Sequence, residues 1–330
     1  MRRRDILLSA PLLGGLLAGR RALAEATLAI GCVIHANPND FYTVNHTHAS
    51  YLRWGLCKAG WCGAWEAKLV VRAGESAAAL DEAAADLVRS DVKVIIAAGT
   101  AAARAAKQAT TTIPVVFYNA TDPVGYRLVA SLSRPDGNVT GFSATDETTP
   151  KLLEFLREIK PRPLLIAHLL DPADVPQDVR ARKAVEHHSA AASLGLGYRE
   201  LPVRNRAEIE TAIPIAKAQR VGALLVEAST LLLTNRFVVA RLAIQNALPA
   251  IYRDRQFAAA DGLIAYGEDL LDLQRRAVVY VDRLLRGAHV SELPVQQASK
   301  FTLVVNLKAA RAIGITIPPT LLARADEVIE

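Results

Sequence analysis

Cysteine is scarce in this sequence, with three residues in a chain of 330. Cys57 and Cys62 lie five positions apart, a spacing that allows a local disulfide in an oxidising compartment. Cys32 is then left alone in a short apolar run, where we expect it to be buried. No second pair of ligands accompanies Cys57 and Cys62, so we expect neither a zinc site nor a catalytic thiol there.

Several signature motifs of enzymes are also missing. The chain has no G-x-S-x-G nucleophile turn, no H-E-x-x-H zinc pair and no G-x-x-x-x-G-K phosphate loop. We therefore predict no catalytic residues and no cofactor. An enzyme remains an alternative, because the members of a catalytic triad can be far apart in sequence.

The histidines do not form a convincing metal site. His46 and His48, with Asp40 nearby, are the best candidates, but residues two positions apart do not share a helix face. His187 and His188 fall in an expected helix and are predicted to face solvent. We therefore predict no metal.

Excess positive charge is confined to the N-terminal segment. The sequence has 39 basic and 33 acidic side chains, and residues 1–24 hold five of the arginines and one of the aspartates. This leaves 34 basic and 32 acidic side chains in residues 25–330. Nucleic-acid binding needs Lys and Arg clustered on one face, so we expect no nucleic-acid partner.

The N-terminal segment has the pattern of a secretory signal peptide. Three arginines and Asp5 precede an apolar stretch at residues 6–19, which is too short to span a bilayer comfortably. An A-L-A sequence at residues 22–24 fits an A-x-A cleavage site. We therefore predict a signal peptide at 1–24 and a periplasmic protein that is exported by the Sec or the twin-arginine route. A short membrane anchor is the alternative.

Strand and helix patterns alternate along residues 25–330, and the hydrophobic content of 51% is enough for two sizeable cores. In the first series we expect strands at 28–34, 68–72, 94–99, 114–118 and 139–142, with helices at 49–58, after Ser76 and at 100–109. In the second series we expect strands at 164–169, 198–203, 223–226, 250–252, 263–265 and 302–305, with helices at 149–160, 178–194, 206–219, 233–246, 270–286 and 307–313. This alternation predicts an α/β fold with two Rossmann-like lobes, each a parallel sheet with helices on both faces.

Two strand-to-helix turns of the same kind, one in each series, are the strongest ligand candidates. The strand at 94–99 ends in a Gly-Thr pair, and the strand at 223–226 leads to a Ser-Thr pair. Ligands gather at the carboxyl ends of parallel strands, and the N–H groups in the first turn of a helix suit a carboxylate. The alternative for the threonine of the first turn is a plain helix cap. The predicted ligand-binding residues of the two turns are Gly99, Thr100, Ala101, Ser229 and Thr230.

Polar residues after other strands extend this set. Asn119 follows a strand and is a plausible cleft wall. Asp122 precedes a proline and suits either a ligand amine or an Asx turn. Asp254 is suited to an ammonium group or to an ion pair with Arg253 or Arg255. We add Asn119, Asp122 and Asp254 to the predicted ligand-binding residues.

Several stretches of the chain match the pattern of one protein family. They are residues 95–100, 112–117, 122–125, 128–135, 137–141, 248–252, 265–267, 300–308 and 317–329. The ending P-P-x-L-L-x-R-A, which begins at Pro318, is the most specific of them. In these stretches the chain resembles the ABC-transporter substrate-binding family that includes tryptophan- and tyrosine-binding periplasmic proteins.

The resemblance implies a type I periplasmic-binding fold, in which three hinge crossovers join two lobes around the ligand. The crossovers are expected near residues 142–146, 266–267 and 293–297. The implied N-terminal lobe is 25–142 plus 267–293, and the implied C-terminal lobe is 143–266 plus 294–330. The helix at 270–286 is then expected to return to the first lobe, and closure about the hinges is the expected motion.

The function implied by the resemblance is that of a solute receptor. A monomer would bind an amino acid or a related carboxylate and deliver it to an ABC permease and ATPase in the inner membrane. A periplasmic sensing subunit for a membrane receptor or kinase is the alternative, because it would share the fold and the cleft. The chain departs from the usual pattern at residues 35–48 and 252–257, and these departures leave the side chain of the ligand open.

Overall fold

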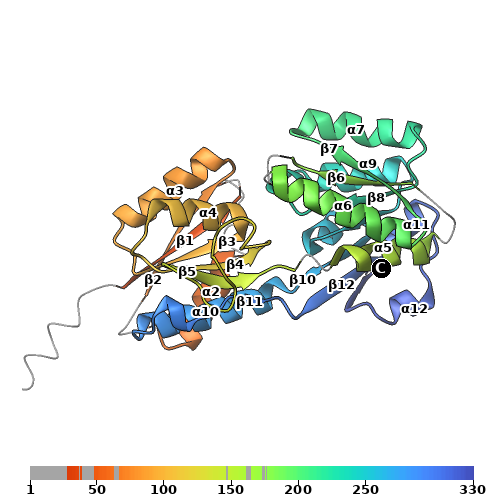
Figure 1. Cartoon of the computed structure of the whole chain (residues 1–330). Helices are drawn as coiled ribbons and strands as arrows, with labels where there is room; N and C mark the ends of the chain where they lie inside the picture. Colours follow the sequence, from red (N-terminus) through yellow and green to blue (C-terminus); the bar gives the residue numbers. More distant parts are fainter. Residues whose placement is uncertain are drawn as a thin grey trace, which may run out of the picture.

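The structure is a computed structural model, and it describes residues 28–36, 38, 48–62, 67–145, 148–160, 165–172, 175 and 177–330. Two lobes lie side by side, each built around a central β-sheet (Figure 1). The predicted signal peptide at 1–24 lies outside the described residues, as does most of the loop between residues 36 and 48. Within the described residues, no helix has both the length and the apolar character needed to cross a bilayer.

The first lobe contains a sheet of order β11-β5-β4-β3-β1-β2, in which all neighbouring strands are parallel. The strands are β1 (Ala29–His35), β2 (Lys68–Gly74), β3 (Val94–Ala98), β4 (Val115–Ala120), β5 (Val139–Ser143) and β11 (Gln296–Gln297). The strand order reverses between β1 and β3. The connections after these two strands therefore leave to opposite faces, and a crevice opens between them at their carboxyl ends.

Helices cover both faces of the first sheet. They are α2 (Ser50–Lys58), α3 (Ala77–Arg89), α4 (Gly99–Ala109) and α10 (Leu270–Leu285). Successive strand residues point to opposite faces. Ile96 and Val116 accordingly join the core under α2 and α10, whereas Ile95 and Val115 join the core under α3 and α4. Although α10 comes late in the chain, its Leu273, Ala277 and Val278 pack in the same apolar core as α2.

The second lobe contains a sheet of order β13-β12-β10-β9-β8-β6-β7. The strands are β6 (Leu165–Leu170), β7 (Gly197–Pro202), β8 (Ala223–Val226), β9 (Ala250–Tyr252), β10 (Ile264–Glu268), β12 (Phe301–Asn306) and β13 (Glu327–Ile329). All pairs are parallel except β10 with β12. These two strands are antiparallel because the chain runs toward the first lobe along β10 and returns from the first lobe along β12.

The helices of the second lobe follow the expected alternation with one difference. They are α5 (Thr148–Ile159), α6 (Gln177–Ser193), α7 (Arg206–Ala218), α8 (Thr230–Thr234), α9 (Arg236–Gln245), α11 (Leu307–Ala312) and α12 (Pro319–Leu322), with 3₁₀ turns at Arg255–Ala260 and Val290–Glu292. A single helix over 233–246 is expected from the sequence, but this prediction is wrong. Asn235 separates α8 from α9, and its side chain donates a hydrogen bond to the Leu231 carbonyl. Such side-chain bonds compete with the backbone hydrogen bonds of a helix, which is why asparagine is unfavourable in a helix interior.

The chain passes between the lobes three times, from β5 to α5, from β10 to α10 and from β11 to β12. The predicted two-lobed α/β fold with three crossovers is confirmed. The Thr145 N–H donates to the Glu268 carboxylate at 3.1 Å, which ties two of the crossovers together. Gln296–Gln297, inside the range expected for the C-terminal lobe, pairs with β5 of the first sheet. The lobe boundaries themselves remain a prediction.

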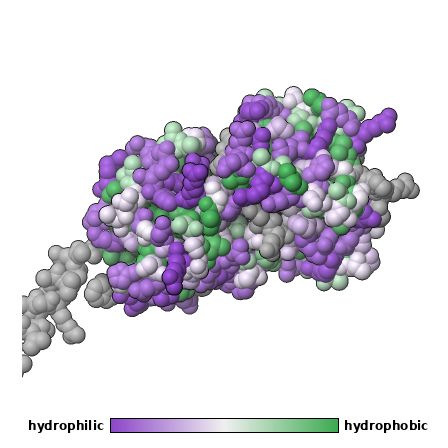
Figure 2. All heavy atoms as spheres, in the orientation of Figure 1, coloured by the Kyte–Doolittle hydropathy of each residue, from purple (hydrophilic) through white to green (hydrophobic). Residues whose placement is uncertain are grey.

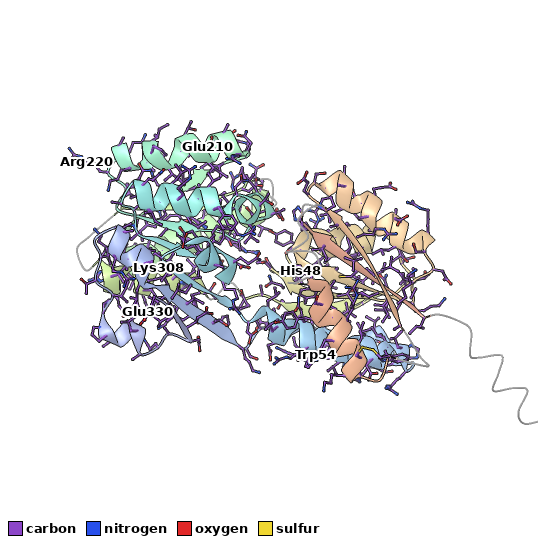
Figure 3. All side chains as sticks on the ribbon, turned by 180° about the vertical axis from the view of Figure 1, so that it is seen from behind. His48, Trp54, Glu210, Arg220, Lys308 and Glu330 are labelled. Carbon is purple, nitrogen blue, oxygen red and sulfur yellow. A yellow bond between two sulfur atoms is a disulfide. The ribbon has the colours of Figure 1, made fainter. Side chains whose placement is uncertain are left out.

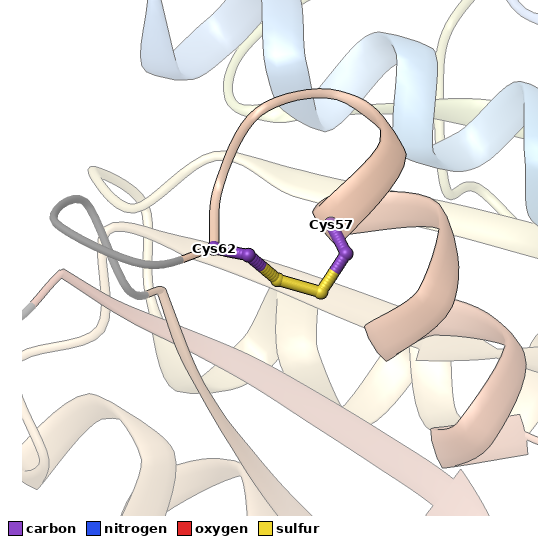
Figure 4. The surroundings of a disulfide bond; sticks show 2 residues. All are labelled: Cys57 and Cys62. Carbon is purple, nitrogen blue, oxygen red and sulfur yellow. A yellow bond between two sulfur atoms is a disulfide. The ribbon is translucent and has the colours of Figure 1, made fainter.

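Cys57 and Cys62 form a disulfide at the end of α2 (Figure 4). It closes the turn that leads from this helix toward β2. Cys32 is free and fully buried in β1, where burial raises the pKa of its thiol to about 12. A thiol with such a pKa is inert at neutral pH.

Candidate functional site

The carboxyl ends of the central strands in both sheets open into one cavity between the lobes. Its lining residues follow β1, β3 and β4 in the first lobe and β6, β8 and β9 in the second. The cavity volume is about 210 Å³. Figure 2 shows a mainly hydrophilic surface over both lobes, with apolar residues scattered on it. This cavity lies where doubly wound sheets place their ligands.

The turn between β3 and α4 forms part of the first-lobe wall. Gly99 begins α4 with a φ of 85°, in the left-handed region that glycine adopts without steric cost. The preceding Ala98 offers no side chain to cap the helix, so no side chain at this position covers the first N–H groups of α4. Gly99, Thr100 and Ala101 all line the cavity. This turn therefore presents a suitable end for an anion.

Thr100 does not cap its own helix. Its hydroxyl oxygen accepts a hydrogen bond from the N–H of Thr121 at 2.9 Å, which joins the start of α4 to the loop after β4. A hydroxyl that accepts one bond can still donate its proton. Thr100 is therefore held in place by the protein and retains a donor.

Two predicted residues near the end of β4 have left-handed backbone conformations, Asn119 within the strand with φ of 58° and Asp122 in the following loop with φ of 41°. The register of β4 against β5 shifts between Tyr118 and Ala120, so Asn119 is bulged out of the strand and lines the cavity. Asp122 does not line it. One of its oxygens accepts from the Gly125 N–H at 2.9 Å, and the other pairs with Arg182 of α6.

On the second lobe, two of the predicted residues line the cavity, whereas the third is buried as a helix cap. Thr230 lines the cavity. Ser229 is 1% exposed and caps α8, because its hydroxyl accepts from the Leu232 N–H at 3.3 Å. Asp254 lines the cavity and caps the 3₁₀ turn Arg255–Ala260 through the Gln256 N–H. Burial raises the pKa of the Asp254 carboxyl, although the Gln256 N–H opposes this.

The structure thus brings Gly99, Thr100, Ala101, Asn119, Thr230 and Asp254 to one cavity. The family profile described as ABC transporter substrate binding protein matches residues 65–329 of the chain. The chain belongs to this family.

One relative with a named ligand is the tyrosine-binding protein of Clostridioides difficile (strain R20291). It is 26% identical to this substrate-binding protein over 227 residues, which is 68% of this chain. The match spans 64% of the relative's own length, somewhat less than two thirds.

Solved structures share the fold of this substrate-binding protein. A conserved domain protein from Vibrio cholerae O1 biovar eltor and an ABC domain from Streptococcus pneumoniae in complex with L-Trp have 24% and 23% identity. Each superposes with a TM-score of 0.82 over 92% of this chain and 100% of its own. A ligand-free, open substrate-binding protein with adhesive properties from Clostridium difficile has 21% identity and a TM-score of 0.66, over 92% of this chain and 99% of its own.

The second-lobe wall of this substrate-binding protein carries a charged group that was not predicted from the sequence. Glu227 follows β8 directly, and its Oε2 lies 3.1 Å from His168 Nε2 and 3.3 Å from Arg253 Nη1. Arg253 also donates to the hydroxyls of Thr148 at 2.8 Å and Thr149 at 3.3 Å. The sequence signal that could have found this pair is a charged residue directly after each of two strands, Glu227 after β8 and Arg253 after β9. The two strands are neighbours in the sheet.

A buried network continues behind this wall. His168 Nδ1 lies 2.7 Å from the Tyr198 hydroxyl, and His187 lies 3.3 Å from the same hydroxyl and 3.1 Å from Thr149 Oγ1. The prediction that His187 faces solvent is therefore wrong, although His188 beside it is exposed. The amphipathic pattern of α6 is weak, so its inward face was not evident from the sequence.

His48 lies on the side of the first lobe that faces the second (Figure 3). Its Nδ1 is 2.6 Å from the buried Tyr118 hydroxyl, and both residues line the cavity. Burial lowers the pKa of His48 to about 4, so the ring is neutral at pH 7. The predicted absence of metal concerned His46 and Asp40 as well, and these lie outside the described residues. Among the residues that are described, no group of three or more His, Cys, Asp or Glu is arranged to hold a metal ion.

Proposed function

We propose that this protein is the extracytoplasmic solute-binding component of an ABC importer and that it binds an amino acid or a related carboxylate between its lobes. The ligand would be held without covalent change, and an ABC permease and ATPase in the inner membrane would receive it. Family membership supports the role in transport. The names of two relatives, one tyrosine-binding and one solved with L-Trp, support an amino acid as ligand.

The observation that carries this proposal is the composition of the cavity wall. The turn Gly99 to Ala101 contributes helix N–H groups and a hydroxyl from the first lobe, and Glu227 and Asp254 contribute carboxylates from the second. A ligand with separate anionic and cationic groups finds complementary partners on opposite walls. Binding to both walls would also favour the closed arrangement of the lobes, which is how such receptors couple ligand to partner.

A thermal-shift screen of residues 25–330 against the L-amino acids and simple carboxylates tests the proposal. A ligand at 100 times its dissociation constant adds about 2.7 kcal/mol to the free energy of unfolding. We expect at least one amino acid or carboxylate to raise the melting temperature by a few degrees. No shift with any compound of either class would contradict the proposed ligand class.

Thr100→Val tests the place of binding. The variant removes the hydroxyl, and with it both the proton that Thr100 can donate to a ligand and the acceptor of the Thr121 N–H. We therefore expect the ligand's dissociation constant to rise about tenfold by calorimetry. Thr211→Val, on the outer helix α7, is the matched control and should bind as the wild type does. Equal affinity in Thr100→Val and the wild type would remove Thr100 from the site.

Reconstitution separates import from sensing. A permease and an ATPase encoded beside this protein, whose ATP hydrolysis in proteoliposomes rises with the loaded receptor, are expected for an importer. Stimulation of a membrane kinase instead would favour the sensing alternative. Sequencing the N-terminus of the exported protein should find Glu25 first, and retention of residues 1–24 would contradict the predicted cleavage.

A further inference from the structure

Glu227 is a carboxylate of the second-lobe wall that two neighbouring side chains, His168 and Arg253, hold in place. It follows β8 at the point where the strand order reverses between β6 and β8, which is the crevice position of the second sheet. Its Oε2 is shared between His168 and Arg253. Among the described residues, none donates a hydrogen bond to Oε1. The side chain is 26% exposed and lines the cavity, so one oxygen remains for a ligand.

The groups around Glu227 keep it ionised. Burial by itself would raise the pKa of this carboxyl, but Arg253, His168 and Lys183 together hold the pKa well below its usual range. Arg253 is only 11% exposed, and its guanidinium is spread over Glu227 and the hydroxyls of Thr148 and Thr149. Its role is that of a positioning residue, because these contacts fix the guanidinium and orient the carboxylate.

The other carboxylates of the cavity are less suited to a ligand cation. Asp254 accepts the Gln256 N–H, Glu268 accepts the Thr145 N–H, and burial raises the pKa of both carboxyls. Glu200, on the edge strand β7, has its carboxylate 3.8 Å from the guanidinium of Arg180 on α6. Asp171 interacts electrostatically with His35 of the first lobe. Glu227 therefore combines a fixed position, a full negative charge and an open oxygen.

We propose that Glu227 binds the ammonium group of the ligand, so that the cleft selects a zwitterionic amino acid over the same molecule without its amine. This inference rests on the proposed function, because the carboxylate of the ligand is taken up by the opposite wall. An ammonium group that donates to a fixed carboxylate in a closed cleft forms a charge-assisted hydrogen bond, which is about twice as strong as a neutral one. Removing the amine would leave Oε1 of Glu227 enclosed without a partner.

The test compares three related ligands by calorimetry on residues 25–330. The panel holds each L-amino acid that binds, its deaminated carboxylic acid and its decarboxylated amine; for L-tyrosine these are 3-(4-hydroxyphenyl)propionate and tyramine. We expect the amino acid to bind roughly 10- to 100-fold more tightly than the deaminated acid. Deaminated acids that bind as well as the amino acids would overturn this inference and leave the proposed function standing. Binding of neither class would overturn both.

Glu227→Gln identifies the residue. We expect the variant to lose most of the preference for the amino acid over the deaminated acid, measured as the ratio of the two dissociation constants. Glu200→Gln removes the same charge from the same cavity and should keep the preference. Equal loss in both variants would point to the general field of the cleft and would overturn the assignment to Glu227.

A second variant covers the case in which Glu227→Gln does not fold, as judged by circular dichroism. Glu227→Asp keeps the charge on a shorter side chain, so the preference for the amine should remain but weaken. Arg253→Lys keeps a cation but cannot reach both threonine hydroxyls and Glu227 at once, and should weaken amino-acid binding more than binding of the deaminated acid. An undiminished preference in both variants would contradict the proposal.

Discussion

At the residue scale, the buried His187 on the second-lobe wall makes stability depend on pH. Burial lowers the pKa of His187 to about 3, and the nearby His168 and Arg253 act in the same direction. The ordinary pKa of histidine is 6.5. Below that pH the unfolded chain therefore binds more protons than the folded one, so the contribution of His187 to stability is present at neutral pH and falls as the pH drops from 6.5 toward 3.

His187→Gln should flatten this dependence. Between pH 7.5 and pH 5, we expect the wild type to lose roughly 2 kcal/mol more of its free energy of unfolding than the variant, measured by urea denaturation. His188→Gln, its exposed neighbour on α6, is the control and should follow the wild type. The same slope in His187→Gln and the wild type would show that His187 is protonated or exposed in the folded protein.

At the element scale, a close approach of two strands sets the position of Arg253. Gly267 of β10 passes the end of β9, where a Cβ added to it would lie 2.2 Å from the Arg253 carbonyl oxygen. Gly267→Ala must therefore displace this backbone, at a cost of about 1–3 kcal/mol. We expect a lower melting temperature together with weaker ligand binding. Unchanged affinity would mean that the ligand does not depend on the Arg253 segment.

The disulfide at the end of α2 is expected to contribute stability without affecting the cleft. Cys57 and Cys62 close a short loop, for which chain entropy gives about 2 kcal/mol. The double variant Cys57→Ser with Cys62→Ser should lose about this amount in urea denaturation and keep the ligand affinity of the wild type. A variant as stable as the oxidised wild type would contradict the entropic account.

Most elements of both lobes follow from local pattern, whereas the charged wall does not. The strands β8 and β9 were predicted at the bounds that the structure has, because short buried runs between turn residues are a local signal. Glu227, Arg253 and His168 come together only through the pairing of β6, β8 and β9, which no local pattern specifies. The six predicted residues that line the cavity were found because each follows a strand or starts a helix there. Ser229 and Asp122 follow the same rule, but their side chains turn back to cap the local backbone.

At the scale of the whole molecule, α6 makes contacts that join the lobes. Val179 belongs to the second lobe, yet it is 2% exposed and packs in the apolar cluster of the first lobe. One turn further on, Arg182 pairs with Asp122 in the loop after β4. Figure 1 shows the first turn of α6 on the side of the second lobe nearest the first. We predict that closure of the lobes about the hinges makes these contacts and that opening breaks them, so that they stabilise the closed conformation.

Val179→Ala should therefore weaken ligand binding without touching the ligand. Losing two buried carbon groups costs about 1.6 kcal/mol of the closed state, which corresponds to a rise of about tenfold in the dissociation constant. Val185→Ala changes a side chain of α6 that is 71% exposed and is the control. X-ray scattering should show a larger radius of gyration for unliganded Val179→Ala than for the wild type. Equal affinities and radii would show that α6 does not join the lobes in solution.

The most direct measurement is a crystal structure of residues 25–330 with the amino acid that binds most tightly in the panel. The account predicts ligand density between the lobes, with the carboxylate at the N–H groups of Gly99 to Ala101 and the ammonium within hydrogen-bonding distance of Glu227. Ligand density outside the interlobe cavity, or a ligand in the cavity whose amine points away from Glu227, would contradict it.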